Sequence, residues 1–437
     1  MTAALYAYSF LDDCVLLYPV YALMFSDADL SVTQISSLFV LWSLTGILLE
    51  VPSGALADAV SRRLLLWTGP LLTAAGFALW VLAPSYWTFA LGFVLWGAKG
   101  AFGSGALEAL VYEELAHLDA ADSYARVMGR ARAASLAGVM TATALAGPAL
   151  AAGGYGLVGA ASVAACVLTA GVALGLPEHR GPEGGGGPGG ESDAGVGGEA
   201  GVGGEAGVGA DCGGSDGGGS GGAGWWGALR AGVAEARGDR AVRGALLLVP
   251  AVTAVWGALD EYTPLLVREA GAGDAEVPWW LLVIWVGATV GSLLAGAVRG
   301  VGAGGLAGLL AGAGLALAAG TALTPHGLPL PAGLALVALA FCAFQLTTVL
   351  ADARLQAAVR GPSRATVTSL AGAATELTTV AVYATYGFLA PQTSHGTTFA
   401  LFATPYVLTA LAMRKRRRGS HHYGPCRHDR RDDTTPD

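Results

Sequence analysis

LEVPSGALADAVSRRLLLW, residues 49–67, interrupts two long apolar runs of the chain. Charged and turn-forming residues crowd into fourteen positions of this segment: Glu50, Pro52, Gly54, Asp58, Arg62 and Arg63. The flanking runs each have about 20 mostly apolar residues, the length of helix that crosses roughly 30 Å of hydrocarbon. The segment therefore predicts a short polar turn between two membrane-spanning helices.

The composition of the whole chain agrees with a membrane protein. Of 437 residues, 54% are hydrophobic and only 13% are charged, and the mean hydropathy is +0.55. In soluble domains roughly a quarter of all residues are charged. The net charge of -8 says little, because a membrane protein distributes its charges between two sides. The five cysteines show no spacing typical of a disulfide framework or a metal pair, and they are interpreted as apolar fillers.

The same length rule predicts twelve spans, six in each half of the chain. They cover residues 5–26, 34–56, 63–83, 86–110, 133–153, 155–176, 243–267, 279–299, 301–323, 330–352, 366–390 and 396–413. The predicted fold class is therefore an all-α integral membrane protein with twelve transmembrane helices. The expected parts of the chain are a first half at residues 1–176, a linker at 177–240, a second half at 241–413 and a basic tail at 414–437.

The loops predict the topology. Residues 177–224 are dominated by glycine and too poor in apolar side chains to fold, so they predict a flexible linker. The stretch that follows, up to residue 240, opens with Trp225 and Trp226 and is a candidate interfacial helix. Arginines gather in alternate loops and in the tail, whereas the loops of the other side carry only Arg268. Because short cytoplasmic loops are enriched in Lys and Arg, both termini and the linker are expected in the cytoplasm.

The opening turn resembles a family signature. Its spacing is similar to that of the major facilitator superfamily between helices two and three, with a glycine, a leucine, an aspartate and a basic pair: Gly54, Leu56, Ala57, Asp58, Arg62 and Arg63. Ser61 stands where the family usually has a glycine and Ala59 where it often has an arginine, so a stiffer turn and one missing ion pair are expected. The segment GSLLAGAVR at residues 291–299 aligns with GALADAVSR at 54–62, as a duplicated architecture implies.

The resemblance implies a transporter of two six-helix bundles that alternates access between the two sides of the membrane. The residues that it assigns to a conformational latch on the cytoplasmic face are Gly54, Asp58, Arg62 and Arg63. The alternative is an ordinary positively charged cytoplasmic turn. Span five carries Gly147-Pro148, which is similar to the glycine-proline motif of the superfamily's antiporters, and this favours export of a drug or metabolite.

Ionisable residues inside membrane spans are costly, and by default they mark substrate or proton sites. The candidates for proton coupling or substrate binding are Asp12, Asp13, Glu50, Lys99, Glu108, Asp260, Glu261 and Glu376. Asp12 and Asp13 are adjacent on a helix and should point about 100° apart. Lys99 is the only cation deep in a span, so we expect a carboxylate partner, with Asp12, Asp13 or Glu376 as the choices.

A structural role stays open for several of these residues. Asp12 and Asp13 are either buried proton carriers or hydrated groups near a helix end. Asp260 and Glu261, late in span seven, either attract cations at the outer mouth or form a wetted helix end. Glu108 is either a coupling residue or a structural one.

Glu376 is the strongest candidate of the second half. It lies in the middle of span eleven among threonines. Polar residues of span ten are expected to line a mixed aromatic and polar cavity together with four aromatic residues, Trp42, Trp96, Trp256 and Tyr383. Aromatic residues in spans also serve as packing or interface anchors, and this alternative stays open.

Sequence motifs of nucleotide-driven pumps, dinucleotide-binding proteins, zinc proteases and serine hydrolases do not occur, so we expect neither an enzyme, a cofactor nor a metal site. The sequence predicts a monomeric secondary transporter of a bacterial cytoplasmic (inner) membrane. Its expected partners are a small-molecule substrate, protons and the lipid bilayer, and not nucleic acid. Proton-coupled export of a small organic molecule is the favoured function. The alternatives are a symporter or facilitator that imports a nutrient, and a non-transporting sensor or scaffold.

Overall fold

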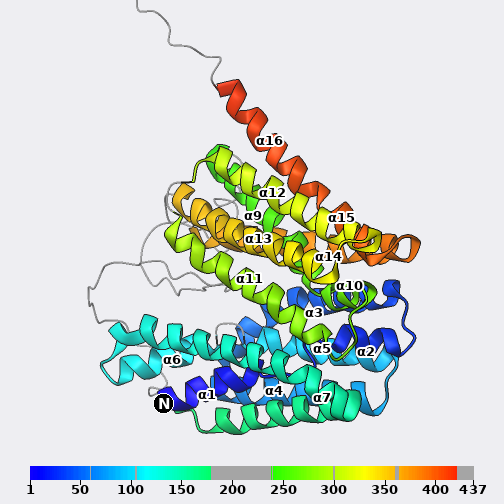
Figure 1. Ribbon diagram of the computed structural model, residues 1–437. Helices are drawn as coiled ribbons and strands as arrows, with labels where there is room; N and C mark the ends of the chain where they lie inside the picture. The colour runs from blue at the N-terminus through cyan, green and yellow to red at the C-terminus, as the bar shows by residue number, and fades with distance from the viewer. Residues whose placement is uncertain are drawn as a thin grey trace, which may run out of the picture.

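The structure of the chain, a computed structural model, describes residues 1–59, 61–103, 106–178, 238, 240–298, 301–359 and 364–420. The side chains of residues 50–59, 240, 241, 364–366 and 415–420 lie outside this description. Every regular element within these ranges is an α-helix or a short 3-10 helix (Figure 1). The glycine-dominated segment, most of the candidate interfacial helix and the tail beyond residue 420 fall outside the described residues.

Described helices lie within each of the twelve predicted spans. Those of the first half are α1 (Thr2–Asp13), α2 (Tyr21–Asp27), α3 (Val32–Ala59), α4 (Arg62–Leu82), α5 (Tyr86–Gly103), α6 (Ala106–His117), η1 (Ala121–Ser123) and α7 (Tyr124–Leu174). Those of the second half are α9 (Arg240–Asp260), α10 (Thr263–Glu269), α11 (Val277–Ala297), α12 (Ala303–Leu323), η2 (Thr324–His326), α13 (Leu330–Ala358), α14 (Arg364–Leu389), η3 (Ala390–Gln392), α15 (His395–Phe402) and α16 (Thr404–Ser420). By length and hydropathy, 8 helices of the described chain could cross a membrane, and the longest of them holds two predicted spans. The all-α membrane class is confirmed.

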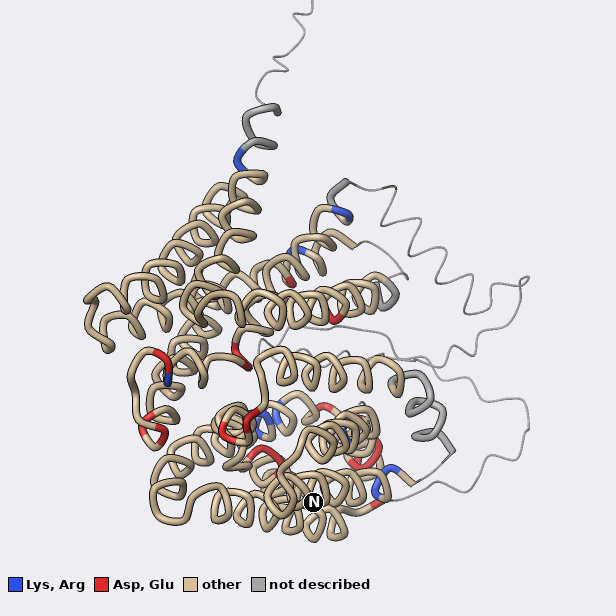
Figure 2. The backbone as a smooth tube through the Cα atoms, turned by 90° about the vertical axis from the view of Figure 1, so that its right-hand side faces the viewer, with Lys and Arg blue, Asp and Glu red and all other residues tan. Residues whose placement is uncertain are grey.

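The helices form two bundles. In the first, α7 packs on α1 and α4, and α5 packs on α3 and α4. In the second, α13 contacts α9, α11 and α12, while α14 packs on α9 and α16 packs on α12. The bundles meet through α3 against α14 and α7 against α11. Figure 1 shows them close together at the end that holds α2 and α10, and diverging toward the end that holds α6. Figure 2 shows long stretches of helix without a single acidic or basic residue, as burial in hydrocarbon requires.

The first predicted span is broken in its middle. Helix α1 ends at Asp13 and α2 begins at Tyr21, so the expectation of one continuous helix over residues 5–26 is wrong. Pro19 lies in the break, where it cannot donate a backbone hydrogen bond. The Leu17 N–H, freed by the break, donates to the Ser162 hydroxyl of α7 at 3.0 Å. A neighbouring helix thus satisfies the backbone where the span is interrupted.

Two further breaks occur at residues that interrupt a helical backbone. Span seven stops at Asp260 and resumes at Thr263, with Pro264 in the first turn of α10, where the missing N–H is tolerated. The long α7 contains non-helical backbone at Gly153 and Gly154, and Gly154 has a φ of 60°, which favours glycine. This kink confirms the predicted boundary between spans five and six.

Gly291 of α11 marks a close contact between helices inside the second bundle. Gly291 lies against the backbone carbonyl of Cys342 on α13, and a Cβ at this position would overlap that oxygen. On the same helix, nothing lies within 4 Å of a Cβ built at Gly296. Replacing Gly291 by alanine therefore changes both the helix contact and the helix propensity, whereas replacing Gly296 changes the helix propensity alone.

We expect Gly291→Ala to lower the midpoint of thermal unfolding in detergent, because overpacking a close contact costs typically about 1–3 kcal/mol. The matched control Gly296→Ala should leave the midpoint unchanged or raise it, since alanine is favoured over glycine in a helix by roughly 1 kcal/mol. Thermal unfolding followed by intrinsic fluorescence measures both. Equal midpoints for the two variants would contradict the close approach of α11 and α13.

Candidate functional site

The predicted latch turn joins α3 to α4, and the described part of it is bound within its own half. The Ser61 hydroxyl caps α4 by accepting a hydrogen bond from the Leu64 N–H at 3.2 Å. Glu178, just beyond the end of α7, accepts a hydrogen bond from the Ser61 hydroxyl and another from the Arg62 N–H at 2.9 Å. The Arg62 guanidinium forms an ion pair with Glu113 of α6. The basic end of the turn therefore has acidic partners in the first bundle.

The remaining latch residues are only partly described. The surroundings of Gly54 and the side chain of Asp58 lie outside the described residues, as does the side chain of Glu50, a proton-coupling candidate that is not part of the latch, although the backbone of all three belongs to α3. Arg63 is partly exposed in the first turn of α4. The latch assignment of these residues stays a prediction.

Lys99 finds its partner in Asp12. The Lys99 ammonium on α5 donates to the Asp12 carboxylate on α1 at 2.8 Å, and the two side chains are 17% and 21% exposed. The aliphatic stem of Lys99 lies on Gly69 of α4, where an added Cβ would come within 3.1 Å of the Lys99 Cγ. The expectation of a carboxylate partner is confirmed, and the ion pair joins helices of the first bundle.

Asp13 points to a different helix from Asp12. Its carboxylate accepts a hydrogen bond from the Ser135 hydroxyl on α7, whereas Asp12 faces α5. The predicted divergence of these adjacent side chains is confirmed. Asp12 is therefore paired with a cation, while the hydrogen-bond partner of Asp13 is a neutral hydroxyl.

Asp260 and Glu261 lie where the second bundle meets the first. Asp260 ends α9, Glu261 lies in the turn before α10, and both are half-buried. The Trp285 indole N–H on α11 donates to Asp260 at 3.1 Å. The Tyr21 hydroxyl on α2 donates to Glu261 from the opposite bundle. Each carboxylate therefore has a donor within the protein, and both interpretations of the pair, a cation-attracting outer mouth and a wetted helix end, stay predictions.

The remaining described candidates, Glu376 and Glu108, each have a buried tyrosine in their surroundings. Glu376 lies on α14, and the buried phenol of Tyr383 on the same helix is within electrostatic range of Glu376, Asp260 and Glu261. Glu108 lies in the first turn of α6, and Tyr8 of α1 is within electrostatic range of Glu108 and of the α1 carboxylates. Tyr8 thus has the described acidic candidates of the first bundle in its surroundings, and Tyr383 has those of the second.

The predicted aromatic and polar residues also gather within each bundle. Trp42 stacks on Trp96 with ring centroids 4.7 Å apart, and Tyr18 stacks on Trp96 at 5.1 Å. In the second bundle, the Trp256 indole N–H donates to the Thr348 hydroxyl at 3.2 Å. All three indole rings are partly exposed, so they remain candidates for the lining of a substrate route.

Polar contacts and rings join the bundles at the α2–α10 end. The Tyr262 hydroxyl donates to the Ser36 hydroxyl at 2.7 Å, and the Thr33 hydroxyl donates to the Gly387 carbonyl at 2.7 Å. The ring centroids of Phe39 and Tyr262 lie 5.2 Å apart. These contacts connect α3 of the first bundle to α14 and the α9–α10 turn of the second.

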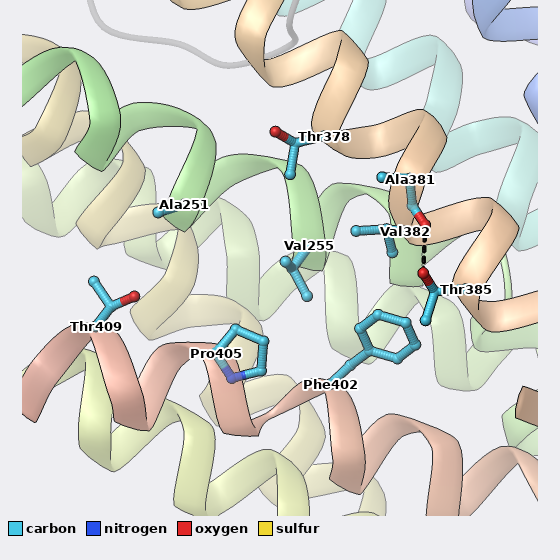
Figure 3. A pocket seen from close by; sticks show the side chains of 9 residues that line it. All are labelled: Ala251, Val255, Thr378, Ala381, Val382, Thr385, Phe402, Pro405 and Thr409. Carbon is cyan, nitrogen blue, oxygen red and sulfur yellow. Dashed lines mark hydrogen bonds between the residues drawn. The ribbon is translucent and has the colours of Figure 1, made fainter.

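A groove of about 280 Å³ lies between α9, α14 and the α15–α16 pair (Figure 3). Its lining consists of Ala251, Val255, Thr378, Ala381, Val382, Thr385, Phe402, Pro405 and Thr409. The Thr385 hydroxyl donates to the Ala381 carbonyl at 2.7 Å, so the helix itself satisfies it. No candidate site residue lines this groove, and it carries no functional assignment.

Sequence reasoning missed the hydrogen-bond donors that hold the candidate carboxylates. Tyr21, Ser135 and Trp285 are common residue types, and only the packing of distant helices gives them a role. Arg268 is the single basic residue that the sequence places in the loops of one side of the membrane. Because the positive-inside rule disfavours arginine in the loops of that side, a single arginine in them indicates a specific partner.

We expect Lys99→Met to lower the midpoint of thermal unfolding, because it leaves Asp12 as an uncompensated carboxylate inside the bundle. Removing one partner of a fully buried pair costs about 3–5 kcal/mol, and partial exposure moves the expected loss to the lower end of this range. The double variant Asp12→Asn/Lys99→Met should recover most of the loss in a double-mutant cycle. Strictly additive losses would contradict a direct pair.

Both the sequence and the fold of the chain resemble those of known proteins. The sequence matches the family described as Major Facilitator Superfamily over residues 3–382. No curated protein sequence matches the chain at a significant level.

Solved structures of transporters resemble the whole chain. The nucleoside transporter NupG has a TM-score of 0.70 and 12% identity, covering 97% of this chain and 99% of that chain. A bacterial homolog of the human lysosomal transporter Spinster, in an inward-facing and unoccupied conformation, has a TM-score of 0.63 and 16% identity, covering 95% and 97%. A D-xylose-proton symporter has a TM-score of 0.62 and 15% identity, covering 94% and 95%. At these identities the likeness shows the fold alone.

Proposed function

The chain belongs to the major facilitator superfamily, and from that premise we propose that it exports a small organic molecule in exchange for protons. The proposed mechanism is alternating access, in which two rigid bundles rock about a binding site between them. The protein is a multi-pass membrane transporter and not an enzyme.

The one-sided contact between the bundles carries this proposal. Hydrogen bonds made by Tyr21, Tyr262 and Arg268 cross between the halves at the α2–α10 end. Toward the α6 end the two bundles diverge (Figure 1). Contact at one end and separation at the other is the arrangement of one of the two states that alternating access requires.

We assign the α6 end to the cytoplasm of a bacterial inner membrane, because the arginine-rich loops lie on that side of the predicted topology. In this orientation both termini and the linker at residues 177–240 are cytoplasmic. The two transport units are residues 1–176 and 241–413, the basic tail is 414–437, and the monomer is the working form.

We propose that the latch is released in this state, on the evidence of its described residues. Arg62 is bound to Glu113 of its own bundle, and the start of α4 is bound to Glu178. In the opposite state we expect the latch turn, with Gly54, Asp58 and Arg63, to contact the second bundle instead. A charge cluster that exchanges partners between two arrangements provides the bistability that a transporter needs.

Asp13 and Glu261 are the proposed proton carriers. Each carboxylate accepts a hydrogen bond from a neutral hydroxyl, Ser135 for Asp13 and Tyr21 for Glu261. Asp12, in contrast, forms an ion pair with the Lys99 ammonium at 2.8 Å. A carboxylate that gains a proton loses its attraction for a cation, but it keeps its capacity to hydrogen-bond to a hydroxyl, so the first two residues can cycle without a large penalty.

A sequence motif in span five supports export as the direction of transport. Gly147-Pro148 is similar to the motif of the superfamily's antiporters, and Gly147 lies at the contact between the bundles. A Cβ at this glycine would overlap the Ala275 carbonyl and come within 3.3 Å of the Trp279 indole nitrogen. The motif thus allows α7 to approach the second bundle closely.

We expect a transported compound to drive proton movement in proteoliposomes loaded with a pH dye, tested with organic cations, sugars and organic acids. Asp13→Asn or Glu261→Gln should reduce this signal to the level of empty vesicles, because neither amide can carry a proton at transport pH. The matched control is Asp122→Asn, which changes an exposed carboxylate of η1 and should leave the signal intact.

The sign of the proton signal decides the mode. Protons that move against the compound establish antiport, whereas protons that move with it contradict the proposed exchange. Full coupling in both carboxamide variants would remove Asp13 and Glu261 as carriers. A compound transported without any proton signal would contradict coupling while leaving transport itself intact.

A further inference from the structure

Arg268 bridges the two bundles at the α2–α10 end. It lies in the last turn of α10, and its guanidinium donates to the Asp27 carboxylate at 2.5 Å and to the Ser26 hydroxyl at 2.6 Å. Both acceptors belong to the last turn of α2 in the opposite half. Asp274 of the second half lies farther away, at 3.8 Å. Two guanidinium nitrogens thus reach across to two neighbouring residues of the first bundle.

Asp27 is held from both bundles at once. One of its carboxylate oxygens accepts a hydrogen bond from Arg268, and the other accepts one from the Tyr155 hydroxyl at 2.6 Å. Tyr155 directly follows the kink of α7 at Gly154. Asp27 ends α2, and Arg268 lies in α10 beyond the break of span seven. Spans one and seven are each broken, and α2 and α10 are the short helices beyond the breaks. The bridge therefore connects α2, α10 and the kink of α7.

We infer that Arg268, Asp27 and Ser26 form an ionic lock that holds the external mouth closed, with Tyr155 as a positioning residue for Asp27. The external location rests on the orientation in the proposed function. Charge-assisted hydrogen bonds to two acceptors fix the relative position of the bundles better than a single contact.

Partial exposure suits a lock that must open. The Arg268 and Asp27 side chains are 27% and 38% exposed, so water can solvate both charges when the bundles part. A buried ion pair would resist separation, whereas an exposed one contributes little and exchanges easily with water. Beneath the lock, the contacts of Tyr21 with Glu261 and of Tyr262 with Ser36 close the same end.

Ser36 provides a reporter of opening. Its side chain is 2% exposed, and its hydroxyl accepts the hydrogen bond of Tyr262 at the closed end. In a Ser36→Cys background, a membrane-impermeant maleimide added outside intact cells should label Cys at this position only while the mouth is open. Peptide mass spectrometry separates this label from labels on the native cysteines.

We expect Arg268→Ala and Asp27→Asn each to raise the external labelling rate by about twofold to fivefold, as the loss of a partly exposed ion pair predicts. The charge exchange Asp27→Arg/Arg268→Asp should return the rate toward that of the parent. Tyr155→Phe should raise the rate less than Asp27→Asn. The matched control Asp274→Asn removes a more distant carboxylate of the same half and should leave the rate unchanged.

Unchanged labelling in well-folded Arg268→Ala and Asp27→Asn would overturn the lock. If Arg268→Ala fails to reach the membrane, Ser26→Ala and Asp27→Asn decide in the same way. Labelling that rises only in inverted vesicles would overturn the external assignment and with it the proposed orientation, while the cross-bundle lock stands. Because the measurement needs neither substrate nor proton flux, failure of proton coupling does not affect it.

Discussion

A polar group inside a hydrocarbon layer must find its partner within the protein, and much of this structure follows from that requirement. Where the first span breaks, the freed Leu17 N–H donates to a serine of a neighbouring helix. Lys99 takes a carboxylate from α1. The Glu261 carboxylate takes its donor, Tyr21, from the opposite bundle. The requirement that stabilises each bundle therefore also joins the bundles at one end.

The two kinds of contact have different consequences for movement. Within a bundle, helices approach at glycines such as Gly291 and share a largely buried ion pair, and such packing favours movement of the bundle as one body. Between the bundles, the described contacts include hydrogen bonds, a partly exposed ion pair and aromatic edges at the α2–α10 end, together with the close approach of α7 at Gly147. Such contacts can be exchanged for water or for other partners at a cost of a few kcal/mol. Rigid bundles with a separable interface are what alternating access needs.

The features of the fold that depend on the local sequence, such as the length and hydropathy of a segment, could be predicted. The positions of the spans follow from length and hydropathy, and the partner of Lys99 could be narrowed to three carboxylates because a cation in a bilayer needs one. The breaks after Asp13 and Asp260 were missed, although Pro19 and Pro264 marked them, since a proline in a membrane span can also sit in a continuous helix. The donors to the candidate carboxylates could not be predicted, because they come from helices that are neighbours only in the folded chain.

Distance measurements between spin labels at both ends test alternating access most directly. One pair, at Trp87 and His326, joins exposed positions of the two bundles at the α2–α10 end, and the other, at Leu118 and Ala353, joins exposed positions at the α6 end. In lipid nanodiscs and without native cysteines, acidification or an added substrate should lengthen the first distance and shorten the second. Two distances that stay fixed, or that change in the same direction, would contradict a transporter that closes one end as it opens the other.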